Sequence, residues 1–390
     1  MSLTIPLPSL AAYRADLAAI QSAGMEERSG HWLSVAVRVE KLAADAPDAR
    51  AAGLPALGAL LLGEESGDLD RISPQLRETV GAAEDAGALR LAHAMVARWR
   101  SIDELSPLER GRCLAVEGRV LRQLDAREQA AERYMEVERI GRRHALPELR
   151  ARAAIGQVVL AQLRGNYPEM RVALTSALAH ATAADEWTLI AQCHQGLMMT
   201  AAAAHDHDAA VSHAWQSFRL AEHDDTSAAE ALVNLGQLLV DLGRYEAALS
   251  AFAAAIVRTP PLRLELPATA GAAVAAATVG DAALVRALAA RIERIDRSTE
   301  GFPYVRAMAL LEAAEACRAV RDDEAAARLR ARAMELATAR GYHEVSLRAE
   351  SLATAPARVE RAPVPLERAS VDIVDRVEAL ADSRALLAAV

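Results

Sequence analysis

The sequence predicts an all-α protein in which pairs of antiparallel helices are stacked side by side. The clearest pair lies in residues 229–260, where apolar residues recur at helical spacing on both sides of a turn. The composition agrees, since the chain is 52% hydrophobic but only 3% aromatic, which makes strands poorly favoured. Glycines also recur at intervals of 38, 40 and 40 residues, at Gly118, Gly156, Gly196 and Gly236.

Residues 229–260 show why these residue types suit a helix pair. Gly236 and Ala248 are small where two helices cross closely, and we expect Phe252 to fill the space beside them. Gly243 supplies the turn because glycine adopts positive φ without steric cost, and Pro260 ends the second helix. One such pair cannot bury its apolar face alone, so the pattern predicts neighbouring pairs.

Four regions follow one another along the chain. Residues 1–105 contain helical segments that match the repeat poorly, and we expect degenerate repeats or an N-terminal cap. Residues 106–352 carry the legible repeats. Residues 353–370 contain three prolines and predict a linker. Residues 371–390 predict an amphipathic helix that caps the stack or lies in a groove of this chain or of a partner.

The repeat pattern resembles the tetratricopeptide repeat (TPR), with leucines at two first-helix positions where Trp and Tyr are usual. Its spacing near 40 residues exceeds the roughly 34 residues of the usual repeat. The chain is therefore similar to the long-repeat solenoids of bacterial regulatory proteins, which sense or sequester partners. The resemblance implies a right-handed superhelical solenoid whose first helices line a concave surface. It covers residues 106–340 well and residues 9–105 loosely.

The charge pattern excludes several classes of function. A formal net charge of −9 argues against general nucleic-acid binding, which needs a basic surface. The 44 Lys and Arg residues include one lysine, Lys41, so the other 43 are arginine. The chain therefore has no phosphate-binding lysine in a Gly-rich loop, and Lys41 is the one candidate for a Schiff base.

Cysteine usage and hydropathy indicate a cytoplasmic protein. The three cysteines, Cys113, Cys193 and Cys317, are odd in number and far apart, which favours a reducing compartment over a disulfide framework. The N-terminus lacks the basic and apolar segments of a secretory signal. The apolar stretch 268–280 is too short and too rich in alanine for a membrane span.

The candidate binding residues are those that the resemblance places on the concave surface. They are Arg112, Arg119, Arg122, Gln123, Arg150, Gln157, His194, Leu197, Thr200, Asn234, Gln237 and Asp241. The arginines at the N-terminal end favour an acidic partner segment, since guanidinium groups bind carboxylates through two parallel hydrogen bonds. The alternative is that these residues form ordinary solvated helix faces in an arginine-rich chain.

Histidines gather in one part of the chain, at His180, His194, His205, His207, His213 and His223. The run at 205–208, with Cys193 nearby in the sequence, has the residue types of a zinc site. We expect His205 and His207 to lie in a turn and His213 on the next helix, which favours a polar turn over a metal site. No cofactor is implied, and no motif pairs a nucleophile with a base, so we expect no enzymatic activity.

Two classes of function remain. The first is a non-catalytic scaffold that binds a protein or peptide along the concave surface of a TPR superhelix. The second is a regulatory sensor that binds a small molecule or a signalling peptide in the same groove.

Overall fold

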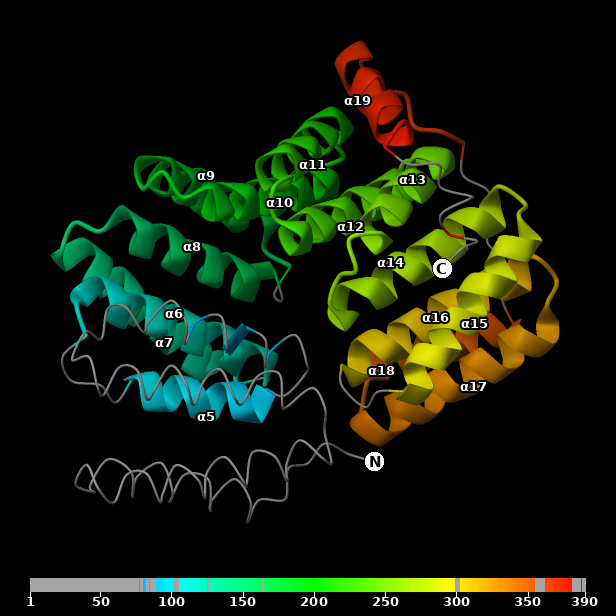
Figure 1. Ribbon diagram of the computed structural model, residues 1–390, viewed down its shortest axis with the longest axis horizontal. Helices are drawn as coiled ribbons and strands as arrows, with labels where there is room; N and C mark the ends of the chain where they lie inside the picture. Colours follow the sequence, from blue (N-terminus) through cyan, green and yellow to red (C-terminus); the bar gives the residue numbers. More distant parts are fainter. Residues whose placement is uncertain are drawn as a thin grey trace, which may run out of the picture. The chain divides into compact units, whose positions relative to one another are not determined.

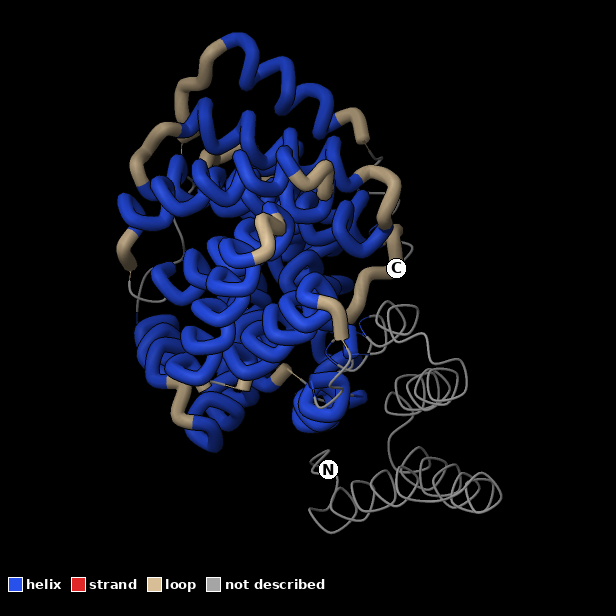
Figure 2. The backbone as a smooth tube through the Cα atoms, turned by 90° about the vertical axis from the view of Figure 1, so that its left-hand side faces the viewer, coloured by secondary structure: helices blue, strands red, loops and turns tan. Residues whose placement is uncertain are grey.

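The computed structural model describes residues 77, 80, 81, 84, 89–100, 105–124, 126–162, 165–298, 302–354, 362–380 and 387. These residues form helices joined by short turns, and none of them lies in a strand (Figure 2). The all-α class and the stacking of helix pairs are therefore confirmed. Most of the predicted region 1–105 lies outside the described residues, as do 355–361 of the predicted linker and most of 381–390.

The chain divides into two compact units, with the boundary between Leu160 and Ala161 in the last turn of α8. Unit 1 contains α5 (Leu89–Arg100), α6 (Pro107–Gln123), α7 (Arg127–Arg143) and most of α8 (Pro147–Gln162). Unit 2 contains α9 (Tyr167–Ala183), α10 (Trp187–Ala203), α11 (His207–Ala221), α12 (Asp225–Asp241), α13 (Tyr245–Ile256), α14 (Leu262–Thr278), α15 (Ala282–Ser298), α16 (Pro303–Ala319), α17 (Asp323–Arg340), α18 (His343–Thr354) and α19 (Arg368–Glu378) (Figure 1).

In unit 1, two of the aligned glycines hold one aromatic ring. The Tyr134 side chain of α7 is buried against Gly118 of α6, where an added Cβ would lie 2.7 Å from the ring. A Cβ on Gly156 of α8 would overlap the same ring. The glycines therefore remove side-chain volume where α6 and α8 meet α7.

From α9 to α18, unit 2 is a row of hairpins in which each helix packs against the next along the chain. The hairpins are α10–α11, α12–α13, α14–α15 and α16–α17, and α9 and α18 pack at either end of this row. The first helices of successive hairpins also contact one another, from α10 to α12, α14, α16 and finally α18. One continuous apolar cluster runs through these helices.

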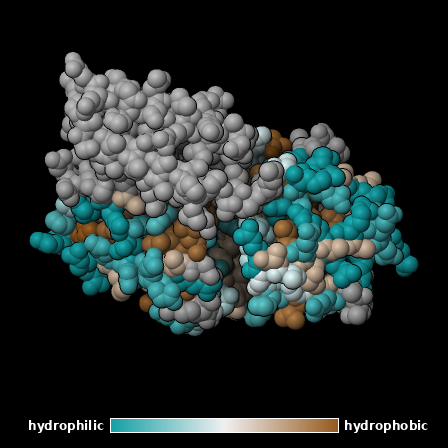
Figure 3. All heavy atoms as spheres, turned by 90° about the horizontal axis from the view of Figure 1, so that it is seen from below, coloured by the Kyte–Doolittle hydropathy of each residue, from teal (hydrophilic) through white to brown (hydrophobic). Residues whose placement is uncertain are grey.

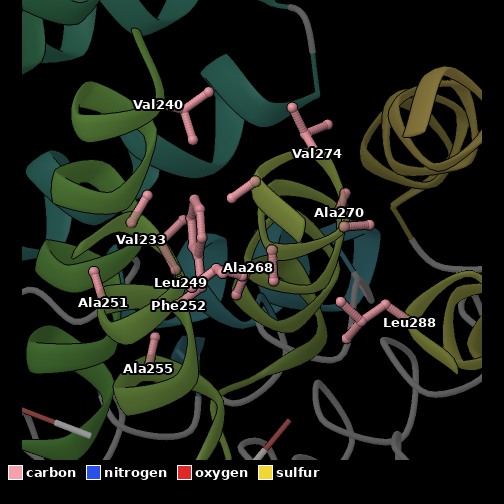
Figure 4. Packing of buried hydrophobic residues seen from close by; sticks show 14 of the residues in the cluster. Val233, Val240, Leu249, Ala251, Phe252, Ala255, Ala268, Ala270, Val274 and Leu288 are labelled. Atoms are coloured by element: carbon pink, nitrogen blue, oxygen red, sulfur yellow. The ribbon is translucent and has the colours of Figure 1, made fainter. Parts of the chain in front are cut away.

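Phe252 lies at the centre of this cluster, and its side chain is fully buried. A Cβ added to Gly236 would lie 2.7 Å from its ring, and a Cβ added to Gly271 would overlap the ring from the side of α14. Figure 4 shows Leu249 and Phe252 of α13 close to Ala268 of α14. Gly271 is thus the next member of the glycine series, at an interval of 35 residues, which differs from the spacing near 40 of the earlier members.

Each of these hairpin turns contains one residue with a positive φ. This residue is glycine in some repeats and another residue in others. Gly243 has a φ of 72°, as the sequence predicts, and Gly280 has a φ of 82°. At the corresponding turns His205 and Arg321 have φ values of 57° and 61°. Positive φ strains a residue that has a Cβ, so these two turns are maintained by the packing of the helices on either side.

Candidate functional site

Arg112 of α6 is already bound to carboxylates of its own unit. Its Nε and one terminal nitrogen donate to the two Glu148 oxygens at 2.8 and 2.5 Å, and its other terminal nitrogen donates to Glu109 at 2.6 Å. These bonds, with that to Glu148 the strongest cause, raise the pKa of Arg112. Burial opposes ionisation of Glu148, but hydrogen bonds from Arg112 and Arg152 hold its pKa below the usual value.

A second pairing engages Arg119 and Gln123. Arg119 donates to both oxygens of the buried Glu84, at 2.9 and 2.5 Å, and the Gln123 amide donates to the same carboxylate at 3.1 Å. The N-terminal part of the predicted surface, with Arg112, Arg119 and Arg122, is its arginine end. This end therefore already binds a carboxylate of the chain itself. Sequence reasoning missed Glu84 because it lies 35 residues before Arg119 in a segment without a clear repeat.

The remaining candidates of unit 1 lie in different surroundings. Arg122 is half-buried beside the Tyr134 hydroxyl, where it counteracts part of the rise that burial causes in the tyrosine pKa. Arg150 of α8 forms an ion pair with Glu138 of α7 at 3.5 Å. Gln157 is exposed.

The expected exposure of His194 and Leu197 is wrong. Both side chains are buried, as is Thr200, because α10 packs against α9, α11 and α12. His194 instead contacts His213 of α11, with 3.0 Å between the two Nδ1 atoms. Burial, assisted by His213, lowers the pKa of His194 to about 4, and burial also lowers the pKa of His213. The pair is therefore uncharged at neutral pH.

The other histidines do not converge on Cys193. His205 lies in the α10–α11 turn as expected, whereas His207 is the first residue of α11. Cys193 is buried, and burial raises the pKa of its thiol to about 12. Among the described residues, no three His, Cys, Asp or Glu side chains gather closely enough to bind a metal ion.

The strongest candidate surface is a polar row on α12 formed by Asn234, Gln237 and Asp241. These residues are three and four positions apart, so they share one side of the helix. Gln237 and Asp241 are exposed and Asn234 is half-buried, although most of α12 is buried and apolar. No described residue hydrogen-bonds to the side-chain amides of Asn234 and Gln237. Two amides thus present unused donors and acceptors.

The polar row ends at α12. In the glycine register the corresponding residues of α14 are Thr269, Ala272 and Ala276, and all three are fully buried. The reason is that α14 packs against α12, α13, α15 and α16 at once. Further along the stack, Arg348 of α18 donates to Glu315 of α16 at 3.1 Å.

Exposed apolar residues do not dominate the surface. In the view of Figure 3 the described surface is mainly hydrophilic, and its hydrophobic patches are small. Within the described part of the chain, every helix is too short or too polar to cross a lipid bilayer.

Comparison with known proteins gives information about the fold alone. No family model matches the sequence, and no curated protein matches it. Among solved structures, BtubC (BKLC) from P. vanneervenii is 14% identical, with 54% of this chain and 88% of that chain covered at a TM-score of 0.40, which is too low to support an argument.

A second solved structure overlaps more of the chain. It is the signal transduction ATPase with numerous domains (STAND) protein with a tetratricopeptide repeat sensor, PH0952, from Pyrococcus horikoshii. It is 13% identical, with 88% of this chain and 52% of that chain covered at a TM-score of 0.52. This chain thus spans about half the length of the STAND protein. It is similar to that protein in fold, as a TPR-like helical repeat.

Proposed function

We propose that this protein is a non-catalytic scaffold that binds a protein or peptide segment through the polar row of α12. The observation that carries the proposal is the pair of amides at Asn234 and Gln237, which have no hydrogen-bond partner among the described residues. An amide side chain both donates and accepts, so two of them on one helix side suit the backbone of an extended peptide. Asp241, one turn further on, adds a negative charge at the end of the row.

The internal ion pairs change the expected chemistry of the partner. An acidic segment at Arg112 or Arg119 would have to displace Glu148 or Glu84 from a two-pronged contact. Such a displacement is costly because it leaves the buried glutamate charge without its arginine partner. We therefore favour a polar segment that is uncharged or basic, bound at α12, over the acidic segment that the sequence suggests.

The absence of catalysis is part of this proposal. Its support is that all three cysteines are buried. Burial raises the thiol pKa in each case, to about 12 for Cys193 and about 11 for Cys317. A thiol in this state is a poor nucleophile, since the thiolate is the reactive form.

The alternative function is a regulatory sensor. The similar STAND protein is described as having a TPR sensor, and a repeat array that binds a small molecule or a signalling peptide would use the same α12 surface. A small ligand that stays bound through purification, detected by native mass spectrometry, would favour the sensor.

The test is affinity capture from the native host with the unmodified protein and the variant Asn234→Ala/Gln237→Ala, followed by mass spectrometry. The matched control is Gln216→Ala, which removes an exposed amide from α11. We expect a specific partner to be lost with the double variant and retained with the control, at equal helical content. Equal capture by all three proteins would refute the assignment of the site to α12.

The sequence-based site is tested in the same experiment. Arg119→Glu/Arg122→Glu reverses charge at the N-terminal end, and Arg328→Glu/Arg330→Glu reverses charge on α17 as a control. Loss of capture with the first pair alone would place the partner on the arginine end. Because the first pair also disrupts the bond to Glu84, its melting temperature must be measured beside its binding.

A further inference from the structure

The segment that precedes α19 is bound to the turns of two successive hairpins. The Val364 N–H donates to the Leu242 carbonyl at 3.0 Å, and Arg244 donates back to the Val364 carbonyl at 3.1 Å, both at the α12–α13 turn. The Glu367 N–H donates to a carboxylate oxygen of Asp208 at 2.9 Å, in the first turn of α11. Backbone groups thus position this segment across both hairpins.

Helix α19 then lies on the outer side of α11 and α13 (Figure 1, red). Its buried residues are Ser370, Val374 and Val377, which share one side at intervals of four and three. The opposite side is charged and exposed, at Asp372, Asp375 and Arg376. The helix is therefore amphipathic, with a narrow apolar stripe against the repeats.

The part of α13 that α19 covers consists mostly of small side chains. All residues of α13 from Ala247 to Ile256 are buried, and most of them are alanine. Of the helices that pack on α13, α12 and α14 belong to the repeat stack, and α19 is the additional one. Small side chains reduce the distance at which two helices pack, so α13 suits close packing of α19.

Helix α19 depends on its contact with the repeats for its structure. An isolated helix of this length is only marginally stable in water, so α19 gains its structure from docking. The contact consists of the three buried side chains, the partly buried Val364, Leu366 and Ile373, and three hydrogen bonds. Docking within one chain is favoured chiefly because the tether raises the effective concentration of the helix.

We propose that the outer surface of α11 and α13 is a docking site for an amphipathic helix, and that α19 occupies it in cis and is displaceable. The helix that the site takes carries a small residue followed by two valines at the spacing of Ser370, Val374 and Val377. It follows an extended segment whose backbone pairs with Leu242 and Arg244. The proposed docking uses none of Asn234, Gln237 and Asp241, so it does not depend on the proposed function.

The test uses the full chain and a labelled peptide of residues 362–380. Val374→Asp/Val377→Asp places two charges in the apolar stripe, which releases α19 and leaves the docking surface intact. We expect the peptide to bind this variant saturably and to bind the unmodified protein at least tenfold more weakly. Asp372→Ala/Asp375→Ala, on the exposed side of α19, is the matched control and should behave like the unmodified protein.

Two further measurements separate the outcomes. A peptide that carries Val374→Asp/Val377→Asp should bind none of the proteins. Val364→Pro removes the N–H that donates to Leu242 without adding charge, and it should increase peptide binding several-fold even if the aspartate variant fails to fold. Absence of peptide binding to both open variants, with unchanged circular dichroism, would overturn the proposal. Equal binding to open and unmodified proteins would also overturn it, because the cis helix would then not occupy the site.

Discussion

Replacing Gly236 by alanine tests the contact on which the repeat register depends. The added methyl group would lie 2.7 Å from Cε1 and 2.9 Å from Cδ1 of Phe252, well inside van der Waals contact. The ring has little room to move, because its side chain is fully buried and Gly271 bounds the same ring. Overpacking of this kind costs about 1–3 kcal/mol, whereas alanine gains about 1 kcal/mol over glycine inside a helix. The net effect is a loss of up to about 2 kcal/mol.

The decisive measurement is a double-mutant cycle with Phe252→Ala. That change alone removes a fully buried ring and should cost about 3–5 kcal/mol. In its cavity the methyl group at position 236 meets no ring, so Gly236→Ala should then stabilise the protein by about 1 kcal/mol. The two changes are therefore coupled by about 1–3 kcal/mol, well above the scatter of independent sites.

Urea unfolding followed by circular dichroism measures all four corners of this cycle. Gly81→Ala is a suitable control, since an added Cβ at this helical position meets no atom within 4 Å. It should be neutral or stabilising in both backgrounds. If Gly236→Ala has the same effect with and without the Phe252 ring, the two residues do not share the contact described, and the glycine register loses its physical basis.

Three other perturbations test buried polar groups and a turn. Asp296→Ala leaves the buried Arg306 without the carboxylate it binds at 2.8 Å, and should lower the free energy of unfolding by about 3–5 kcal/mol in urea titration. The pKa of His194 is about 4 in the folded state, below its value in the unfolded state. The free energy of unfolding therefore has its full value above about pH 6.5 and should fall by roughly 2 kcal/mol towards pH 5. His194→Gln should flatten that pH dependence, and an equally steep slope would contradict the buried pair with His213. Gly243→Ala should cost about 1 kcal/mol, seen as a lower melting temperature, since φ at this turn is 72°.

The fold was accessible from the sequence because its signals are local. Helical spacing of apolar residues specifies which side of a segment becomes buried, and it does so without knowledge of the partner. A glycine such as Gly243 marks a turn because only its own backbone conformation is involved. The series from Gly118 to Gly236 extended this local pattern into a repeat, and a repeat of helix pairs implies a stack.

The candidate site was less accessible because exposure depends on neighbours that are remote in sequence. The register placed Asn234 and Gln237 where solvent reaches them, yet the same register placed His194 and Leu197 on a side of α10 that its neighbouring helices cover. Each position has the same place in its own helix. What differs is the packing of the adjacent helices, which local periodicity does not encode.

By itself, the sequence determined the helices, the turn at Gly243 and the close crossings marked by glycine. Tertiary structure alone decided that Glu84 and Glu148 neutralise the arginines, and that α19 returns to lie on α11 and α13. The physical reason is one of range. Backbone conformation and side-chain periodicity act within a few residues, whereas an ion pair or a docked helix requires two remote segments to meet. Which segments meet is set by the packing of the whole unit.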